Sequence, residues 1–455
     1  MTKTKFKHDF LRGLGSSLIE LQSCDNPGQF SEIVLYGCTH NTTYDMQCEG
    51  DRGWYLYQAA QLAGNKEAIE VAVVNKFFRI REDHWMFDQL TSILYHFAAD
   101  GSQTARAALY QQYEGILNEL SPKKKKVIKK EFCVYPRRDM FEWLCVWLTS
   151  LDGWSAFKRI VQDISEILLP QDEDGFFFEW FYSNSKGKFG EKRVDGYLQK
   201  QAERSPFIIA YYEKAKAWDN HVYQKTPEPT LDDVLAASNG EKFHGRGTAM
   251  RFARTASESD IEKLMEIALQ EPNELRKAEL LWGLRKAKYP FSDNFIAELL
   301  KSENEDIRDT AFYIMEQAPS PKMREYALTL LQKGEETVNA ISLLAKNLLP
   351  QDEQFFCEKV KSLPIKFSKG DWHGAFMSAE SGISGMKFRP KTDVLEYMHR
   401  ETFCGSCRER IVRIMHKKRV LSEPVLQECL YDSNSDIRIF AERIIKSRKG
   451  TPIIQ

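Results

Sequence analysis

The sequence predicts an all-α protein in which helical hairpins stack as repeats. A short segment recurs in the C-terminal half at a nearly fixed spacing, and apolar residues follow helical intervals in both halves. A fixed period between about 20 and 50 residues is typical of stacked repeat arrays. No stretch of useful length alternates between apolar and polar residues, as a half-buried strand would. A sheet is therefore not expected as a main element.

The recurring segment starts with polar residues and continues into an apolar stripe. Its versions surround Leu275, Ile307, Val338 and Ile437. The successive intervals between these residues are 32, 31 and 99 residues, and the last equals three steps of 33. One helix pair cannot bury its own apolar face, so neighbouring pairs must stack against each other.

The unit around Ile307 shows the expected hairpin most clearly. Its first helix has an apolar stripe formed by Ile307, Ala311, Ile314 and Ala318. Pro319 punctuates the end of that helix, and Pro321 suits the first position of the second helix. Gly334 is the expected stop of the second helix, because glycine readily adopts the left-handed conformation found there.

The N-terminal half is also expected to be helical, with degenerate repeats. One apolar stripe is formed by Phe87, Leu90, Ile93, Leu94 and Phe97 and is closed by Asp100 and Gly101. We divide the chain into an N-terminal helical region, residues 1–230, and a repeat region, residues 231–455. Residues 363–390 contain four glycines and are expected to form an irregular insert in the repeats.

The composition is that of an ordinary globular protein. The hydrophobic fraction is 42%, the charged fraction is 28% and the formal net charge is -1, which argues against a disordered chain or a strongly basic nucleic-acid coat. The N-terminus shows no apolar signal region, and no apolar run is long enough to cross a membrane. Nine scattered cysteines suggest reduced thiols. We therefore expect a cytoplasmic protein without membrane contact.

The hairpin units resemble HEAT repeats over roughly residues 255–350 and 400–446. The resemblance is one of pattern, and it implies an α-solenoid, a right-handed superhelix with a long concave surface that binds a protein or peptide partner. Asp306-Ile307-Arg308 and Asp436-Ile437-Arg438 are similar to the ladder of Asp and Arg that connects repeats in this family. The resemblance implies a structural role for these residues.

The segment 40–52 is the densest polar stretch of the N-terminal half. It contains His40 and the candidate binding residues Asp45, Glu49, Asp51 and Arg52. Carboxylates beside a histidine could perform acid–base chemistry or hold a metal. Capping of the following helix explains the same residues, because acidic side chains favour a first helical turn.

Two basic segments are candidate anion-binding sites. The first contains Lys123, Lys124, Lys125 and Lys126, which could neutralise phosphates or simply form a solvated helix start. The second contains Arg246 and Arg251, close to two glycines that would let a backbone approach an anion. The alternative for the second segment is the entry turn of the first clear repeat.

The Cys404-Gly405-Ser406-Cys407 pair could bind zinc or perform thiol redox chemistry. Zinc would need two more ligands, for which His416 and Cys429 are the nearest candidates. The spacing fits no common zinc module, and the βαβ context of redox pairs is missing. The third alternative is that both cysteines pack at a helix start. We expect no cofactor other than this zinc.

Two functions from different classes fit these features. The first is a non-catalytic scaffold that binds a protein or peptide partner on its concave face. The second is a nucleic-acid-binding protein, because the chain resembles DNA glycosylases built from HEAT-like repeats. The candidates for that function are Trp143, Trp147, Asp152 and Trp154. Common phosphate-binding, hydrolase, metalloprotease and kinase motifs are absent from the sequence, which favours the scaffold.

Overall fold

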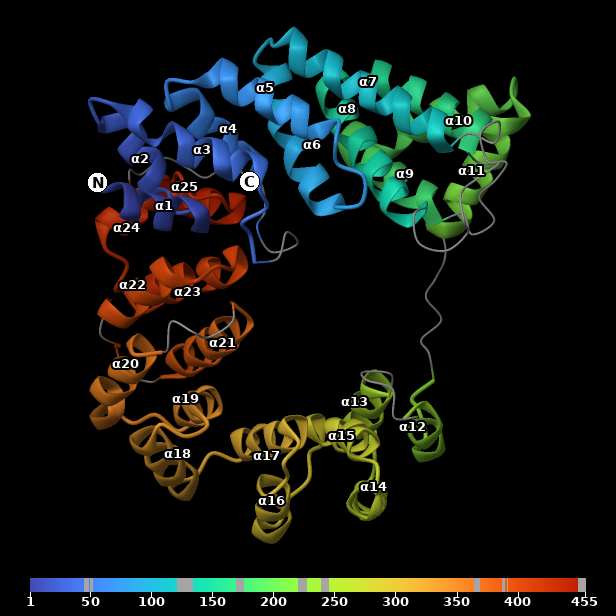
Figure 1. Cartoon of the computed structure of the whole chain (residues 1–455). Helices are drawn as coiled ribbons and strands as arrows, with labels where there is room; N and C mark the ends of the chain where they lie inside the picture. The colour runs from blue at the N-terminus through green and yellow to red at the C-terminus, as the bar shows by residue number, and fades with distance from the viewer. Residues whose placement is uncertain are drawn as a thin grey trace. The chain divides into compact units, whose positions relative to one another are not determined.

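The structure, a computed structural model, describes residues 1–44, 49, 52–120, 134–168, 176–219, 227–238, 245–363, 369–386, 389–390 and 392–448. Every regular element in these ranges is a helix, as the sequence predicts (Figure 1). Two compact units divide the chain. Unit 1 comprises residues 1–222, 400–409 and 421–455, and unit 2 comprises residues 223–399 and 410–420. None of the described helices combines the length and apolar character that a membrane crossing requires.

Unit 1 is built mainly from the N-terminal helices. They are α1 (Lys3–Arg12), α2 (Ser16–Ser23), η1 (Pro27–Phe30), α3 (Ser31–Thr39), α4 (Arg52–Leu62), α5 (Lys66–Phe77), α6 (His84–Ala99), α7 (Gln103–Leu120), α8 (Val134–Asp163), η4 (Ile164–Leu168, a π-helix), α9 (Phe176–Phe189), α10 (Glu191–Ala202) and α11 (Pro206–Asp219). Helices α4, α6 and α8 contact one another in succession. Helix α5 contacts α4 and α6, and α7 contacts α6 and α8.

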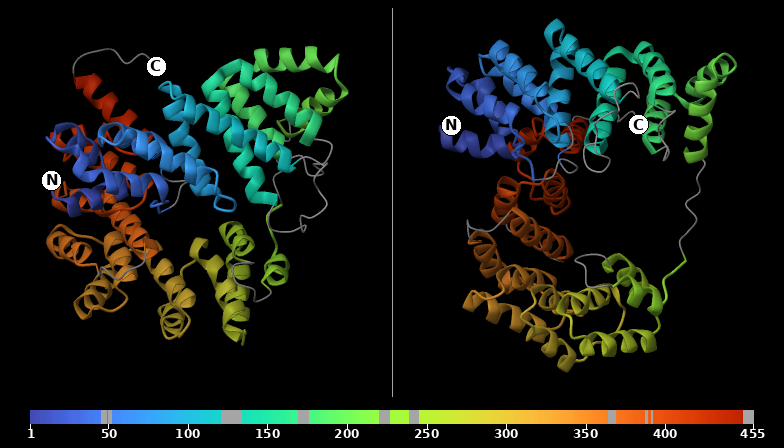
Figure 2. Two further views of the ribbon diagram at one scale, coloured as in Figure 1. Left: turned by 45° about the horizontal axis from the view of Figure 1, so that its top comes forward. Right: turned by 45° about the vertical axis from the view of Figure 1, so that its right-hand side comes forward.

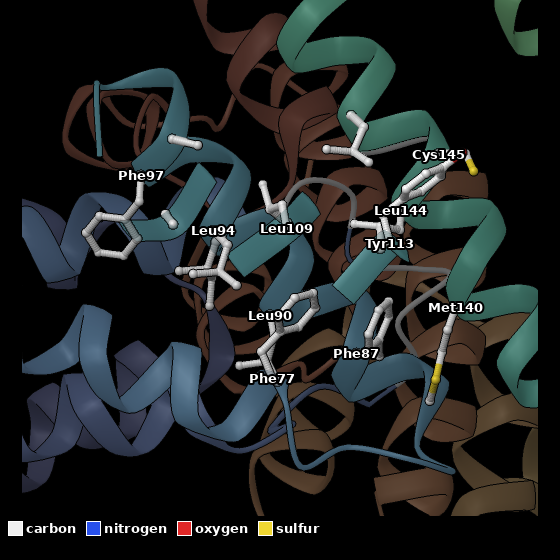
Figure 3. Packing of buried hydrophobic residues seen from close by; sticks show 14 of the residues in the cluster. Phe77, Phe87, Leu90, Leu94, Phe97, Leu109, Tyr113, Met140, Leu144 and Cys145 are labelled. Carbon is white, nitrogen blue, oxygen red and sulfur yellow. The ribbon is translucent and has the colours of Figure 1, made fainter. Parts of the chain in front are cut away.

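Part of the core of unit 1 lies where α5, α6, α7 and α8 meet. Figure 3 shows side chains from these four helices packed together: Phe77, Phe87, Leu90, Leu94, Phe97, Leu109, Tyr113, Met140, Leu144 and Cys145. All ten are at most 1% exposed. The apolar stripe predicted for residues 87–97 is confirmed, and α6 ends just before Gly101, whose φ is +98°. Short-range sequence signals are sufficient to define this helix.

The C-terminal part of unit 1 contains α24 (Glu423–Cys429) and α25 (Ser435–Arg448), which lie against the N-terminal helices. The backbone N–H of Ser433 donates to the Gly13 carbonyl at 2.8 Å. Glycine is needed at Gly13, where φ is +80°, and at Gly15, where a Cβ would lie 2.0 Å from the Glu428 oxygen.

The two compact units differ from the two regions predicted from the sequence, and the boundary at residue 230 stays a prediction. Residues 400–409 and 421–455 belong to unit 1 and not to the C-terminal unit. The repeat pattern shows which helix faces are apolar. It does not show which helices cover the apolar faces of the C-terminal residues 421–455, which belong to unit 1.

Unit 2 contains the clearest succession of hairpins. Its helices are α12 (Leu231–Ala237), α13 (Arg246–Thr255), α14 (Glu258–Gln270), α15 (Glu274–Trp282), η6 (Gly283–Lys286), α16 (Asp293–Leu300), α17 (Glu305–Gln317), α18 (Pro321–Lys333), α19 (Thr337–Lys346), η7 (Pro350–Asp352), α20 (Glu353–Lys361), α21 (Lys369–Gly385) and α22 (Thr392–Glu401). Part of α23 (Gly405–Lys417) completes it. Helices α13, α15, α17, α19 and α21 contact one another in succession, and the views show them in chain order (Figures 1 and 2).

Helices α17 and α18 begin and end at the predicted signals, but they do not pack on each other as the predicted hairpin, because α17 packs on α16 and α18 packs on α19. The Asn304 side chain accepts a hydrogen bond from the Asp306 N–H at 3.0 Å and caps the start of α17. Pro321 is the first residue of α18, as predicted. Gly334 ends α18 in the left-handed conformation, with φ of +74°. Both boundaries depend on residues within one helical turn, so the sequence alone defines them.

The prediction of an irregular insert at residues 363–390 is wrong. Most of this segment is the 17-residue helix α21, which packs on α19. Its buried hydrophobic residues are Ala375, Phe376, Ala379 and Ile383, which lie on one helix face. Gly382 allows the close approach, because a Cβ there would lie 2.4 Å from the Ala345 oxygen. Glycines that suggested a loop thus include one that permits tight helix packing.

Candidate partner-binding surface

Two residues of the polar segment that precedes α4, Glu49 and Arg52, are buried in unit 1. Asp45 and Asp51 lie outside the described residues, whereas Glu49 and Arg52 are 0% and 2% exposed. Arg52 Nη1 is 3.4 Å from Glu49 Oε2, and Nη2 donates to the Leu11 carbonyl at 2.9 Å. Burial raises the pKa of Glu49, and the Arg52 charge opposes that shift. This pair connects the segment to α1, and its burial keeps it from a partner.

Of the two basic segments, the structure describes only the one that contains Arg246 and Arg251. Lys123, Lys124, Lys125 and Lys126 lie outside the described residues. Arg246 in unit 2 forms an ion pair with Asp306, and its guanidinium carbon lies 3.8 Å from the centre of the Trp282 ring. Arg251 Nη2 donates to the Pro227 carbonyl at 2.6 Å. Both arginines thus connect elements of unit 2.

The cysteine pair lies at the start of α23. Cys404, Cys407 and Cys429 are each 1% exposed, and the Cys407 N–H approaches Cys404 Sγ at 3.5 Å. His416 is exposed and nine residues beyond Cys407 on the same helix, which corresponds to about 14 Å along the axis. One ion cannot be shared over that distance, so the structure does not assemble the ligand set expected with His416. Zinc on the two thiols stays a prediction for metal analysis of the purified protein.

Aromatic side chains gather on one surface of unit 1, where α6 lies beside α8. We define the aromatic strip as His84, Trp85, Asp88, Tyr95 and His96 of α6 with Trp143 and Trp147 of α8. All seven are half-buried. The ring centres of Trp85 and Trp143 are 5.2 Å apart, and those of Tyr95 and Trp147 are 4.8 Å apart. His84 lies 5.6 Å from Trp143, which extends the row of rings.

Local sequence explains how the two helices form this strip. The Asp83 side chain caps α6 by accepting from the Met86 N–H at 2.9 Å. Trp85 and Asp88 are separated by three residues and Trp143 and Trp147 by four, so each pair shares a helix face. The apolar stripe of α6 enters the core and leaves the strip partly exposed.

Asp88 is the carboxylate of the strip. Trp147 Nε1 donates to Asp88 Oδ1 at 3.2 Å and fixes one side of the carboxylate against the indole. Sequence reasoning selected Trp143 and Trp147 but missed Trp85, Tyr95 and Asp88. The available signal was the His-Trp-x-x-Asp arrangement of residues 84–88, which has polar and aromatic residues at helical spacing.

The other two candidates for nucleic-acid binding, Asp152 and Trp154, contact residues outside the aromatic strip. Asp152 accepts hydrogen bonds from Arg106 and Tyr110 of α7. Burial, together with Asp152, raises the pKa of Tyr110 to about 12. The Arg193 guanidinium lies 4.4 Å from the Trp154 ring centre. The four candidates therefore do not form one constellation around the tryptophans of α8.

The strip offers flat aromatic faces and one oriented carboxylate to a partner. Partly exposed aromatic clusters are enriched at interaction sites, where a large ring contributes much contact area at little entropic cost. The sequence matches no known family model, and no curated protein shows significant similarity to it.

Proposed function

We propose that this chain is an interaction scaffold of HEAT-like helical repeats that binds a protein or peptide partner, with the aromatic strip as part of the binding surface. The observation that carries the proposal is the row of half-buried rings on α6 and α8, with Asp88 among them. Large aromatic side chains dominate the energetics of many protein interfaces. Three half-exposed tryptophans close together expose apolar area to water, which is uncommon on a protein surface that binds no partner.

The repeat part of the proposal is supported by helix spacing in unit 2. Helices α15, α17, α19 and α21 begin at residues 274, 305, 337 and 369, which gives steps of 31, 32 and 32 residues. Each of these helices also contacts the next one in the series. Equal steps with equal neighbours are expected when similar units stack.

A recurring arginine contact gives independent support. Arg308 Nη1 donates to the carbonyls of Ser302 and Glu303, both at 2.9 Å. Arg438 Nη1 donates to the carbonyls of Asp432 and Ser433 at 2.7 and 3.1 Å. In both cases the acceptors lie six and five residues before the arginine. The same local contact in two distant segments is expected of related repeat units.

A nucleic acid is the second candidate partner, because nucleobases stack on aromatic rings. Trp143 and Trp147 share one face of α8, and Asp88 lies beside them. Phosphate binding needs cations, and α6 and residues 139–157 of α8 contain no lysine or arginine, although Arg137 and Arg138 directly precede this part of α8 in the sequence. These surroundings favour a protein or peptide partner.

Affinity capture from the native lysate tests the proposal. The wild-type chain and a Trp85→Leu/Trp143→Leu variant are used as bait, and captured proteins are quantified by mass spectrometry. We expect a defined protein to be enriched by the wild type and depleted at least severalfold by the variant. Trp180→Leu is the matched control, because Trp180 is 40% exposed on α9 and lies outside the strip.

The Asp88→Asn variant is a second, milder change in the strip, and it tests the proposal even if the double variant does not fold. Asparagine keeps the acceptor oxygen for Trp147 and removes the charge, and circular dichroism establishes that each variant is folded. If the strip variants and Trp180→Leu capture the same proteins in the same amounts, the strip is not the binding surface.

A further inference from the structure

A small cleft lies between α8 and α9 of unit 1, and its volume is about 250 Å³. Its lining residues are Val146, Thr149 and Ser150 of α8 and Phe181, Asn184, Ser185 and Lys188 of α9. These positions recur at helical spacing, so each helix turns one face to the cleft. None of the seven belongs to the aromatic strip, and the cleft is therefore a second candidate site.

A lysine and a serine provide hydrogen-bond donors at this cleft. Lys188 Nζ donates to Ser150 Oγ at 3.2 Å. An ammonium group carries three N–H groups, and a hydroxyl that accepts a hydrogen bond can still donate its own proton. Lys188 is exposed, whereas Ser150 is half-buried, so the cation lies on the solvent side of the cleft. The pair thus offers a positive charge and a hydroxyl proton to a group that enters.

Thr149 adds a buried hydroxyl to the same cleft. The residue is 3% exposed, and its Oγ1 has no hydrogen-bond partner among the residues that the structure describes. A buried hydroxyl without a partner is uncommon in folded proteins, because the group has lost water and gained no hydrogen bond in exchange. An acceptor atom of a ligand in the cleft would satisfy it.

The other lining residues give the cleft a fixed and partly apolar wall. Asn184 Nδ2 donates to the Trp180 carbonyl at 2.8 Å, and Ser185 Oγ donates to the Phe181 carbonyl at 2.7 Å. Both polar side chains are therefore held against the backbone of α9. Val146 and Phe181 contribute apolar surface beside them. A ligand of matching character combines an acceptor group with an apolar part.

We propose that the cleft between α8 and α9 binds a carboxylate that carries a short apolar chain. One ammonium group balances the single charge of a carboxylate, and the Thr149 and Ser150 hydroxyls can donate to its oxygens. No carboxylate is among the described lining residues, and Glu142 lies one helical turn before Val146 on α8. A phosphate group carries nearly two charges at neutral pH, which one lysine does not balance.

The volume of the cleft limits the size of this ligand. A water molecule occupies about 30 Å³ in the liquid, so 250 Å³ suits a ligand of roughly eight non-hydrogen atoms. Hexanoate has this size and the required chemistry. The same carboxylate chemistry also occurs at the C-terminus of a peptide that ends in an apolar residue, and the experiment distinguishes these two sources.

Saturation-transfer NMR on the full chain, with hexanoate as the probe, tests this inference. Titration should give a dissociation constant of about a millimolar, as expected for a ligand of this size. Hexanamide has a similar chain without the charge and should bind at least roughly tenfold more weakly. Inorganic phosphate at matched ionic strength should not displace hexanoate. Displacement by a tetraglycyl-leucine peptide, but not by its C-terminal amide, would add the peptide terminus as a source.

Matched variants connect the binding to this cleft. Lys188→Met removes the cation and should weaken hexanoate binding roughly tenfold or more. The control is Lys200→Met, because Lys200 is an exposed lysine in the last turn of α10, as Lys188 is in the last turn of α9. It should bind as the wild type does, and circular dichroism establishes that each variant is folded.

Thr149→Val provides a second test with its own readout. Valine keeps the shape of threonine and removes only the hydroxyl, so hexanoate binding should weaken severalfold. Thermal stability should not fall, because the hydroxyl has no partner to lose in the described part of the structure. A clear loss of stability would show that this hydroxyl is already satisfied, which would contradict its assignment to a ligand.

Three further results would overturn the inference. The first is equal affinity of the wild type, Lys188→Met and Thr149→Val for hexanoate. The second is equal affinity of the wild type for hexanoate and hexanamide, or displacement of hexanoate by phosphate at a similar concentration. The third is absence of binding by both hexanoate and the free peptide. Binding of the free peptide alone would keep the carboxylate and assign it to a chain terminus.

Discussion

Arg408 and Asp432 form a two-point ion pair that is almost fully buried. Arg408 Nε lies 2.7 Å from Asp432 Oδ2, and Nη2 lies 2.9 Å from Oδ1. The two side chains are 0% and 1% exposed. Arg408 Nη2 also donates to the Ser433 hydroxyl at 3.1 Å, and the Ser433 N–H donates to Gly13. The pair thus lies where the C-terminal helices meet the N-terminal ones.

Loss of one member of this pair should destabilise unit 1 strongly. Arg408→Met leaves the Asp432 carboxylate buried without its cation, so we expect the free energy of unfolding to fall by about 3–5 kcal/mol. Urea unfolding followed by circular dichroism measures the change. The control is Arg448→Met, which removes an exposed pair with Glu423 and should cost at most about 1 kcal/mol. Similar losses for the two variants would contradict a special role for the buried pair.

Two glycines of α21 should respond in opposite ways to the same substitution. Gly382→Ala forces a Cβ to within 2.4 Å of the Ala345 oxygen, and we expect a loss of about 1–3 kcal/mol as α19 and α21 separate. Gly374→Ala meets nothing within 4 Å and should stabilise the helix by about 0.5–1 kcal/mol. Thermal unfolding of both variants checks the signs. A gain in stability for Gly382→Ala would show that the two helices can move apart at no cost.

Local signals account for the part of the fold that the sequence predicts correctly. Pro321 and Gly334 bound α18 because each acts on its own backbone, and the stripe of residues 87–97 is buried because its period is helical. The helix at residues 369–385 was missed for a physical reason. Glycine weakens a helix in isolation but also lets two helices approach, and only the position of α19 decides between these effects.

The candidate site was predictable only in part. Trp143 and Trp147 are recognisable as one helix face, but their neighbours Trp85 and Asp88 are some 60 residues away in sequence. Likewise, nothing local distinguishes Arg408, which is fully buried, from an exposed arginine. Contacts between distant helices depend on how the helices stack. Local signals in a single sequence do not predict this stacking.

Loss of the Asn304 cap should destabilise α17 by a modest, predictable amount. The Asn304 side chain accepts from the Asp306 N–H, which has no partner within the first turn of the helix. We expect Asn304→Ala to lower the free energy of unfolding by about 1 kcal/mol, and Asn304→Ser to restore most of it. Urea unfolding measures the change in free energy, and hydrogen exchange of the amides in α17 shows whether the loss is local to this helix. Equal exchange in the wild type and Asn304→Ala would contradict the capping role.

The stability of the α1 region should depend on pH through His8. His8 Nδ1 lies 2.9 Å from Asp9 Oδ1, and Nε2 lies 3.0 Å from Glu401 Oε2. These hydrogen bonds, that to Asp9 first, raise the pKa of His8 above its ordinary value of 6.5, although burial opposes them. A raised folded-state pKa means that the protonated form is stabilised on folding. Its contribution is therefore complete below pH 6.5 and disappears as the pH rises through the folded-state pKa.

The His8→Gln variant tests this dependence. We expect it to be less stable than the wild type at pH 5.5, and the difference in unfolding free energy should shrink as the pH is raised to 9. The two values are obtained from urea unfolding in matched ionic strength. Because Glu401 supplies one of the two carboxylates, Glu401→Gln should reduce the pH dependence of the His8 effect without removing it. A difference that is constant from pH 5.5 to 9 would mean that His8 stabilises the region by packing alone and not through its charge.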